Sequence, residues 1–209
     1  YLSRTGELNP TNQYSRRAYP TGAAKWRGGR EFESLLLLRP LGDRGRNRNK
    51  ECLMAIYYIE TTIPSFYHDV RVEPEMVARR DWTRKWYDLA VTSDRIVSSA
   101  AVLDELQRGD FPGRDDCLDM LNTIEMLELN APVFEIVEAY LENNLMPADP
   151  FGDALHLALA SYHRCDFLVT WNCQHLANAN KFGQIRRVNG ILGLFTPELV
   201  TPMELLGGT

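Results

Sequence analysis

Four polar residues stand at positions where a parallel sheet would gather them into one site. Glu60 directly follows a short apolar and aromatic run, and Asn172 follows another such run, Phe167 to Thr170. Glu105 and Asp153 each border an apolar helical stretch. Because open α/β sheets bind ligands outside the carboxyl ends of their strands, we expect these four side chains to meet there.

Three carboxylates brought together need a cation beside them. Two carboxylates about 5 Å apart repel by roughly 3 kcal/mol at an effective dielectric constant of 20, and three such pairs repel by about 10 kcal/mol. No Lys or Arg adjoins the three acids, apart from Arg108 on the Glu105 helix. Hard oxygen ligands select Mg²⁺ or Mn²⁺, and such an ion suits phosphodiester hydrolysis. We therefore predict a Mg²⁺ (or Mn²⁺) site ligated by Glu60, Glu105 and Asp153, with Asn172 orienting the metal or its water.

Each of these residues also has a purely structural explanation. Glu60 could begin a solvated loop, although the flanking Ile59 and Pro64-Ser65-Phe66 indicate a packed one. Asp153, in the first turn of its helix, is favoured by the helix dipole alone by about 0.3 to 1 kcal/mol. His156 can hydrogen-bond a ligating carboxylate or a substrate phosphate, but a buried histidine that is satisfied locally is more common.

Strands and helices alternate along the sequence. Short apolar runs predict strands at 55–59, 95–97, 124–129, 167–170 and near 198–201. Apolar spacing and capping residues predict helices at 75–90, from Ser98 or Ser99 to Gly109, and at 115–121. A fourth helix is expected to start at Pro132, and a fifth has Asp149 as its N-cap and Pro150 at its first helical position. This alternation predicts an α/β fold with a mainly parallel central sheet and helices on both faces.

Charge is divided unevenly along the 209 residues. Of the 23 Lys/Arg and 28 Asp/Glu, residues 1–53 hold 11 and 5, and residues 54–209 hold 12 and 23. The first part has little apolar periodicity, and its run Leu35 to Leu38 is too short for a signal-peptide core or a membrane span. We expect residues 1–53 to be a basic, disordered extension and residues 54–209 to be one domain. If the natural domain starts at Met54, residues 1–53 are non-native or read-through sequence. A basic arm that grips nucleic acid is the functional alternative for the extension.

The cysteines give no sign of a disulfide framework or of a zinc site. The chain has four of them, none in a C-x-x-C pair, and no secretory signal, so we expect a reduced, cytoplasmic protein. His163-x-Cys165 and Cys173-x-His175 together offer four zinc-type ligands. The predicted strand between them would hold the two pairs roughly 13 Å apart, whereas zinc ligands lie about 2 Å from one ion, so zinc is not expected.

Four short motifs, in order, resemble the PIN-domain family, specifically the VapC-like ribonuclease toxins of type II toxin–antitoxin modules. The motifs that carry the resemblance are Tyr58-Ile59-Glu60-Thr61-Thr62, Val102-Leu103-Asp104-Glu105-Leu106, Asp153-Ala154-Leu155 and Thr170-Trp171-Asn172. The resemblance extends from Met54 to Leu206 and places the family's acids on Glu60, Glu105 and Asp153. Glu60 stands where the family usually has Asp, and Asn172 where many relatives have Asp.

The resemblance implies a three-layer α/β/α sandwich and a Mg²⁺- or Mn²⁺-dependent endoribonuclease. It also implies RNA as substrate, a cognate antitoxin protein as partner, a homodimer and no association with a membrane. Asn172 removes one negative charge from the site, so a second metal would be held less well. The alternative is a PIN-like binding module with weak or no catalysis that acts through a protein partner.

Two further groups of residues could take part in binding. Lys181, Arg186 and Arg187, on a predicted helix after the site, form the densest basic group of the acidic domain and could hold RNA; a solvated helix face explains them equally well. Trp82 and Trp86 pack their helix or meet a partner protein. A phosphohydrolase of another doubly wound fold would need a nucleophilic Asp after the first strand or a glycine-rich phosphate loop, and Glu60-Thr61-Thr62 supplies neither.

Overall fold

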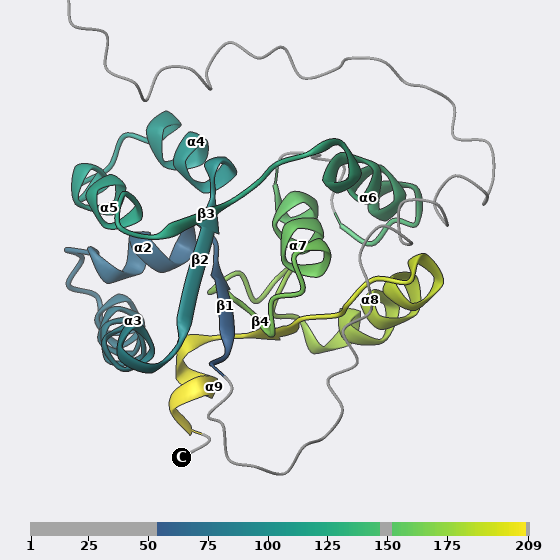
Figure 1. Cartoon of the computed structure of the whole chain (residues 1–209). Helices are drawn as coiled ribbons and strands as arrows, with labels where there is room; N and C mark the ends of the chain where they lie inside the picture. Colours follow the sequence, from purple (N-terminus) through teal and green to yellow (C-terminus); the bar gives the residue numbers. More distant parts are fainter. Residues whose placement is uncertain (1–53, 147–151, 208–209) are drawn as a thin grey trace, which may run out of the picture. The chain divides into compact units, whose positions relative to one another are not determined.

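The computed structural model describes residues 54–146 and 152–207, which form an α/β fold around a five-stranded sheet. The strands are β1 (Ile56–Ile59), β2 (Arg95–Ser99), β3 (Glu125–Leu127), β4 (Phe167–Val169) and β5 (Glu198–Val200). All pairings are parallel, and the spatial order is β3-β2-β1-β4-β5 (Figure 1). All five strands were predicted from apolar runs, and the sheet proves to be wholly rather than mainly parallel.

The helices of the described residues connect the strands. Their bounds are α2 (Thr62–Tyr67), α3 (Pro74–Ser93), α4 (Ala100–Arg108), α5 (Arg114–Leu121), α6 (Ala131–Glu142), α7 (Asp153–Tyr162), α8 (Ala179–Leu192) and α9 (Pro202–Gly207). In Figure 1, α2 to α5 lie on one side of the strands and α6 to α8 on the other, which is compatible with a three-layer α/β/α fold. In the described ranges, no helix combines the length and the apolar character that crossing a bilayer requires.

β1 occupies the centre of the sheet because both of its faces are apolar or aromatic. Tyr58 and Ile59 are fully buried, as expected for a parallel strand covered by helices on both sides. Two carboxylates fix its amino end: Asp94 accepts a hydrogen bond from the Ala55 N–H at 3.0 Å, and Asp166 accepts one from the Ile56 N–H at 2.9 Å. Since these acids precede β2 and β4, the three central strands begin in register.

Apolar residues pack on both faces of the sheet. On the side of α2 to α5, the core includes Ile63, Trp86 and Leu106. On the other side, α7 is buried along nearly its whole length, from Ala154 to Ser161. A helix that is apolar all round must be covered all round, and α7 packs against β4 and α6. Its first residue, Asp153, is thereby held at one fixed place beside the sheet.

Three local expectations need comment. A packed loop was predicted after Glu60, but the chain forms the short helix α2, which tolerates Pro64 because N–H groups in a first turn have no helical partner. Ser99 stands at the N-cap of α4 without capping it, since its hydroxyl bonds Tyr58 instead. The described part of α7 begins at Asp153; the predicted cap at Asp149-Pro150 lies outside the described residues.

Candidate active site

The strand order creates one place where connections leave in opposite directions. From β1 the chain proceeds outward to β2 and β3, then crosses back to β4 and β5 on the other side of β1. The carboxyl ends of β1 and β4 are therefore the topological switch point, where α/β sheets bind their ligands. Glu60 directly follows β1, and Thr170 to Asn172 directly follow β4.

Glu60 is a buried carboxylate with only 4% of its surface exposed. Its oxygens accept hydrogen bonds from the Thr62 N–H at 3.0 Å and from the Thr62 hydroxyl. Burial raises the pKa of Glu60, and the nearby His156 together with hydrogen bonds from Thr62 and Thr170 offsets only part of that rise. Glu60 is thus a desolvated acid whose negative form gains from any nearby positive charge.

Glu105 reaches the same region from α4 and is better stabilised as an anion. One of its oxygens accepts a hydrogen bond from the Thr61 hydroxyl, and Oε1 lies 3.2 Å from Nε2 of His156. Burial pushes the pKa of Glu105 upward, but the hydrogen bond and charge of His156, with smaller effects of Thr61 and Arg108, outweigh burial and leave the pKa lowered. Glu60 and Glu105 therefore differ in their ease of ionisation because of their surroundings.

His156 stands at the centre of the cluster with 2% of its surface exposed. Its Nδ1 lies 2.8 Å from the Tyr58 hydroxyl, which lies 2.9 Å from the Ser99 hydroxyl. Because an ionised Glu105 can only accept, Nε2 must carry a hydrogen and donate to it in both protonation states of the ring. Nδ1 then accepts from the Tyr58 hydroxyl when the ring is neutral and donates to it when the ring is charged. Burial lowers the pKa of His156, but Glu105, Glu60 and Asp153 together outweigh that effect and raise it.

Asp153 and Asn172 complete the cluster from α7 and the end of β4. Asn172 donates an amide hydrogen to Oδ1 of Asp153 at 2.8 Å, and its own oxygen accepts from the His175 N–H at 3.1 Å. Burial raises the pKa of Asp153, partly offset by His156, His175 and Asn172. Asn172 therefore fixes the orientation of Asp153; a direct role toward a metal or its water remains a prediction.

The donor set has the chemistry of a Mg²⁺ or Mn²⁺ site, although it is not closed around a point. Three carboxylates, one directly after β1 and the others on α4 and α7, all interact electrostatically with His156, and no Lys or Arg forms an ion pair with them in the described ranges. Hard, anionic oxygens of this kind suit Mg²⁺ or Mn²⁺. Within residues 54–146 and 152–207, no group of three or more His, Cys, Asp or Glu side chains is spaced to hold an ion as it stands.

The predicted basic group on α8 is spread along the helix. Lys181, in the first turn, donates to the Leu145 carbonyl oxygen at 3.4 Å. Arg186 pairs with Glu198 at 3.4 Å, and Glu198 begins β5 at the amino edge of the sheet, opposite the acid cluster. Arg187 is exposed. The structure does not bring Arg186 to the switch point, and an RNA contact by these three residues remains a prediction.

Sequence reasoning did not select the hydroxyl groups that hold the acids. Thr61 and Thr62 follow Glu60 directly, Tyr58 precedes it by two positions, and Ser99 lies at the end of β2. Their only sequence signal is their place at the ends of two buried strands. Because a hydroxyl at such a place can face core, solvent or site, only the fold distinguishes them.

The cysteines of the described residues are free thiols. Cys117 and Cys165 are buried, and Cys173 is exposed. Burial raises the pKa of Cys117 to about 11 and that of Cys165 to about 12, so neither forms a reactive thiolate near neutral pH. The strand β4 does separate His163-x-Cys165 from Cys173-x-His175, as the argument against a shared zinc ion assumed.

No family profile, curated protein or solved structure matches this chain.

Proposed function

We propose that this chain is a Mg²⁺- or Mn²⁺-dependent endoribonuclease of the PIN-domain type, in which Glu60, Glu105 and Asp153 are the metal ligands. One observation carries the proposal: at the switch point of a parallel sheet, Glu105 contacts the buried His156 with 3.2 Å between Oε1 and Nε2, and the carboxylates of Glu60 and Asp153 act electrostatically on the same imidazole. One buried and two half-buried acids in one region are costly unless a cation offsets their charge, and perturbed acids in one place are typical of functional sites.

Phosphodiester hydrolysis assigns different tasks to the residues of the cluster. When bound, the ion would activate water and stabilise the charge that develops on the phosphate. Glu60 supplies a carboxylate from the end of β1, with Thr62 fixing its direction. Glu105 is held by Thr61 and His156, and Asp153 by Asn172. These hydrogen bonds position the ligands, and such outer contacts commonly change metal affinity or activity by about 10- to 100-fold when removed.

The same proposal extends to fold family, partners and compartment. The parallel sheet with helices on both faces fits the three-layer sandwich of PIN domains, and the four motifs resembling VapC-like toxins include every acid of the cluster. A cytoplasmic toxin of this kind would act on RNA, pair with an antitoxin protein and form a homodimer. These parts of the proposal rest on the resemblance rather than on any contact in the structure.

Cleavage of labelled RNA by the full chain tests the proposal. A mixed set of single-stranded RNAs is incubated with Mg²⁺, Mn²⁺ or EDTA, beside the Asp153→Ala and Glu105→Gln variants. We expect divalent-dependent cuts that fall by about 100-fold or more in both variants, since each loses a ligand charge. Asp104→Asn is the matched control, because Asp104 is an exposed acid that adjoins Glu105 on α4. This variant should cut RNA as the wild type does. Equal cutting by all proteins, or cutting in EDTA, would refute the assignment.

A PIN-like binding module without catalysis is the second candidate. Its support is that every acid of the cluster is already hydrogen-bonded and that Asn172 adds no charge. This candidate predicts a folded chain that binds Mn²⁺ but cuts none of the RNAs. Cleavage abolished by Asp153→Ala would exclude it.

A further inference from the structure

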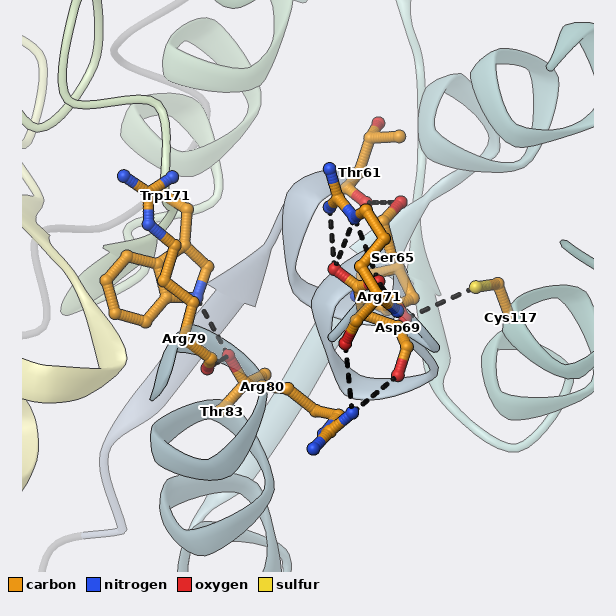
Figure 2. Close-up of polar contacts among 10 residues, drawn as sticks. Thr61, Ser65, Asp69, Arg71, Arg79, Arg80, Thr83, Cys117 and Trp171 are labelled. Carbon is orange, nitrogen blue, oxygen red and sulfur yellow. Dashed lines mark hydrogen bonds and ion pairs between the residues drawn. The ribbon is translucent and has the colours of Figure 1, made fainter. Parts of the chain in front are cut away.

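Arginine and aromatic side chains gather on the α2–α3 side of the acid cluster. We call this set the arginine–aromatic surface: Phe66, Arg71, Arg79, Trp82 and Trp171. The Cζ atom of Arg79 lies 5.5 Å from the ring centroids of both Phe66 and Trp171. Trp82 stacks on Trp171 with centroids 6.2 Å apart and keeps 37% of its surface exposed. Figure 2 shows Arg79 alongside the indole of Trp171.

The charges of this surface are only partly neutralised. The Arg71 guanidinium donates to both carboxylate oxygens of Asp69, and burial opposes but does not cancel the resulting drop in the pKa of Asp69. Arg80 donates to the carbonyl oxygens of Asp69 and Arg71 (Figure 2) and also pairs with Asp81. Arg79, by contrast, forms no ion pair with a carboxylate in the described part of the chain. The two rings hold its guanidinium in place while its charge stays available.

The surface adjoins the acid cluster through shared residues. The Trp171 N–H donates at 2.8 Å to the Thr62 hydroxyl, which itself bonds Glu60. Phe66 lies one helical turn after Thr62 on α2. The indole N–H of Trp171 donates to Thr83 at 2.8 Å, which fixes α3 against the end of β4 (Figure 2). Arg79, one turn before Thr83, is therefore anchored beside the carboxyl edge of the sheet.

An available cation here has a specific use in an acidic domain. Residues 54–209 carry 12 Lys/Arg against 23 Asp/Glu, so the domain as a whole repels a polyanion. A local cation next to exposed aromatic area is the combination by which proteins hold single strands, with phosphates on the cation and bases on the rings. The basic group on α8 does not offer this at the switch point, because Arg186 pairs with Glu198 at the other edge.

We infer that the arginine–aromatic surface holds single-stranded RNA beside the acid cluster, with Arg79 contacting a phosphate and Trp82 stacking on a base. The inference deepens the proposed nuclease function and rests on it for the identity of the substrate. The location of the RNA on α3 is independent of that function and can be tested without catalysis.

Fluorescence anisotropy of a 5′-fluorescein-labelled 12-nucleotide RNA of mixed sequence, with the full chain in EDTA, measures binding without cleavage. For Arg79→Gln we expect weaker binding and a slope of log affinity against log salt that is smaller by about 0.7, the value of one phosphate contact on a single strand. For Trp82→Ala we expect affinity to fall about fivefold or more, as for the loss of one stacked base. Arg79→Lys keeps the charge and should retain the salt dependence of the wild type.

Arg164→Gln is the matched control, since Arg164 is an exposed cation three residues before β4, at the amino edge of the sheet and away from Arg79 and Trp82. Circular dichroism verifies that each variant is folded. Wild-type affinity and salt dependence in both Arg79→Gln and Trp82→Ala, or an equal loss in Arg164→Gln, would overturn the inference, and the surface would then be assigned to a protein partner. If the wild type still cuts RNA in Mg²⁺, that result leaves the nuclease intact; if it neither binds nor cuts RNA, both proposals fail.

Discussion

At the scale of single residues, a chain of hydrogen bonds from Ser99 through Tyr58 and His156 to Glu105 explains how a carboxylate of the cluster is held in place. Tyr58 links Ser99 to His156, and His156 links that pair to Glu105. Each of these groups is deeply or partly buried, so each hydrogen bond replaces water that the group has lost. The position of Glu105 is thus set from within the core.

Tyr58→Phe removes the central hydroxyl of this chain and leaves the Ser99 hydroxyl and Nδ1 of His156 without their partner. A buried polar group that loses its hydrogen bond costs about 1 to 3 kcal/mol, so we expect the free energy of unfolding to fall by that amount. Urea denaturation followed by tryptophan fluorescence measures it. A change well below 1 kcal/mol would mean that Tyr58 does not support His156.

His156→Gln tests the electrostatic state of the cluster through its pH dependence. The pKa of His156 is raised, because the three carboxylates outweigh burial. The protonated form is therefore favoured in the folded protein, and its stabilisation is complete below the ordinary value of about 6.5 and is lost as the pH rises through the raised value. We expect the wild type to exceed His156→Gln in stability by more at about pH 6 than at about pH 8.5. A difference in unfolding free energy that is constant or grows with pH would contradict this.

The sequence indicated some of these residues and not others for a physical reason. Glu60 and Asp153 are visible because an acid beside an apolar run is unusual and costly. Tyr58 and Thr61 are ordinary strand and turn residues, and only the distance to a partner many positions away gives them a role. Residue type thus reveals the charged members of the cluster, whereas the residues that hold them by hydrogen bonds are revealed only by tertiary contacts.

At the scale of elements, a polar network joins the three helices on the far side of the sheet. The Tyr140 hydroxyl of α6 donates to Oδ1 of Asn189 on α8 at 2.6 Å, and the Asn189 amide donates to the Ser161 hydroxyl on α7 at 3.1 Å. All three side chains are buried. Because α7 carries Asp153, this network also fixes one acid of the site.

Tyr140→Phe should destabilise the protein through that network. The change leaves Oδ1 of Asn189 buried without its donor, and we expect a loss of about 1 to 3 kcal/mol in unfolding free energy. Thermal unfolding by circular dichroism, with Tyr87→Phe as a comparison at a half-buried tyrosine on α3 outside this network, would show whether the loss is specific. Equal effects of both changes would argue against a role for the network.

Element prediction succeeded where burial leaves a periodic signal. The five strands are short apolar runs, and α3 to α6 carry apolar residues at helical spacing. The helix α2 has only six residues and contains Pro64, so neither length nor period distinguishes it from a loop. It forms because Ile63 and Phe66 are buried in the core, which local sequence does not reveal.

At the scale of the whole molecule, charge separates the chain into a basic part and an acidic part. Residues 1–53 lie outside the described residues, so the expected extension stays a prediction. If the proposed nuclease is correct, every ligand of the site lies within 54–207. The basic part can then affect how tightly RNA is held but not where it is cut.

A chain starting at Met54 should therefore bind RNA less tightly and with a smaller salt dependence than the full chain, because it lacks 11 Lys/Arg. The positions of Mg²⁺-dependent cuts should stay the same. Sequencing-gel analysis of the products, after circular dichroism has established that the shorter chain is folded, checks this. New cut positions in the shorter chain would show that residues 1–53 take part in substrate selection.

The account as a whole depends on whether Glu60, Glu105 and Asp153 share a divalent cation. Isothermal titration of Mn²⁺ into the full chain at neutral pH, beside Glu105→Gln, Asp153→Asn and the control Asp104→Asn, measures this directly. We predict saturable binding by the wild type and the control, and an affinity lower by about tenfold or more in the two site variants. Absence of saturable binding by the folded wild type, or equal affinity in all four proteins, would contradict the metal site.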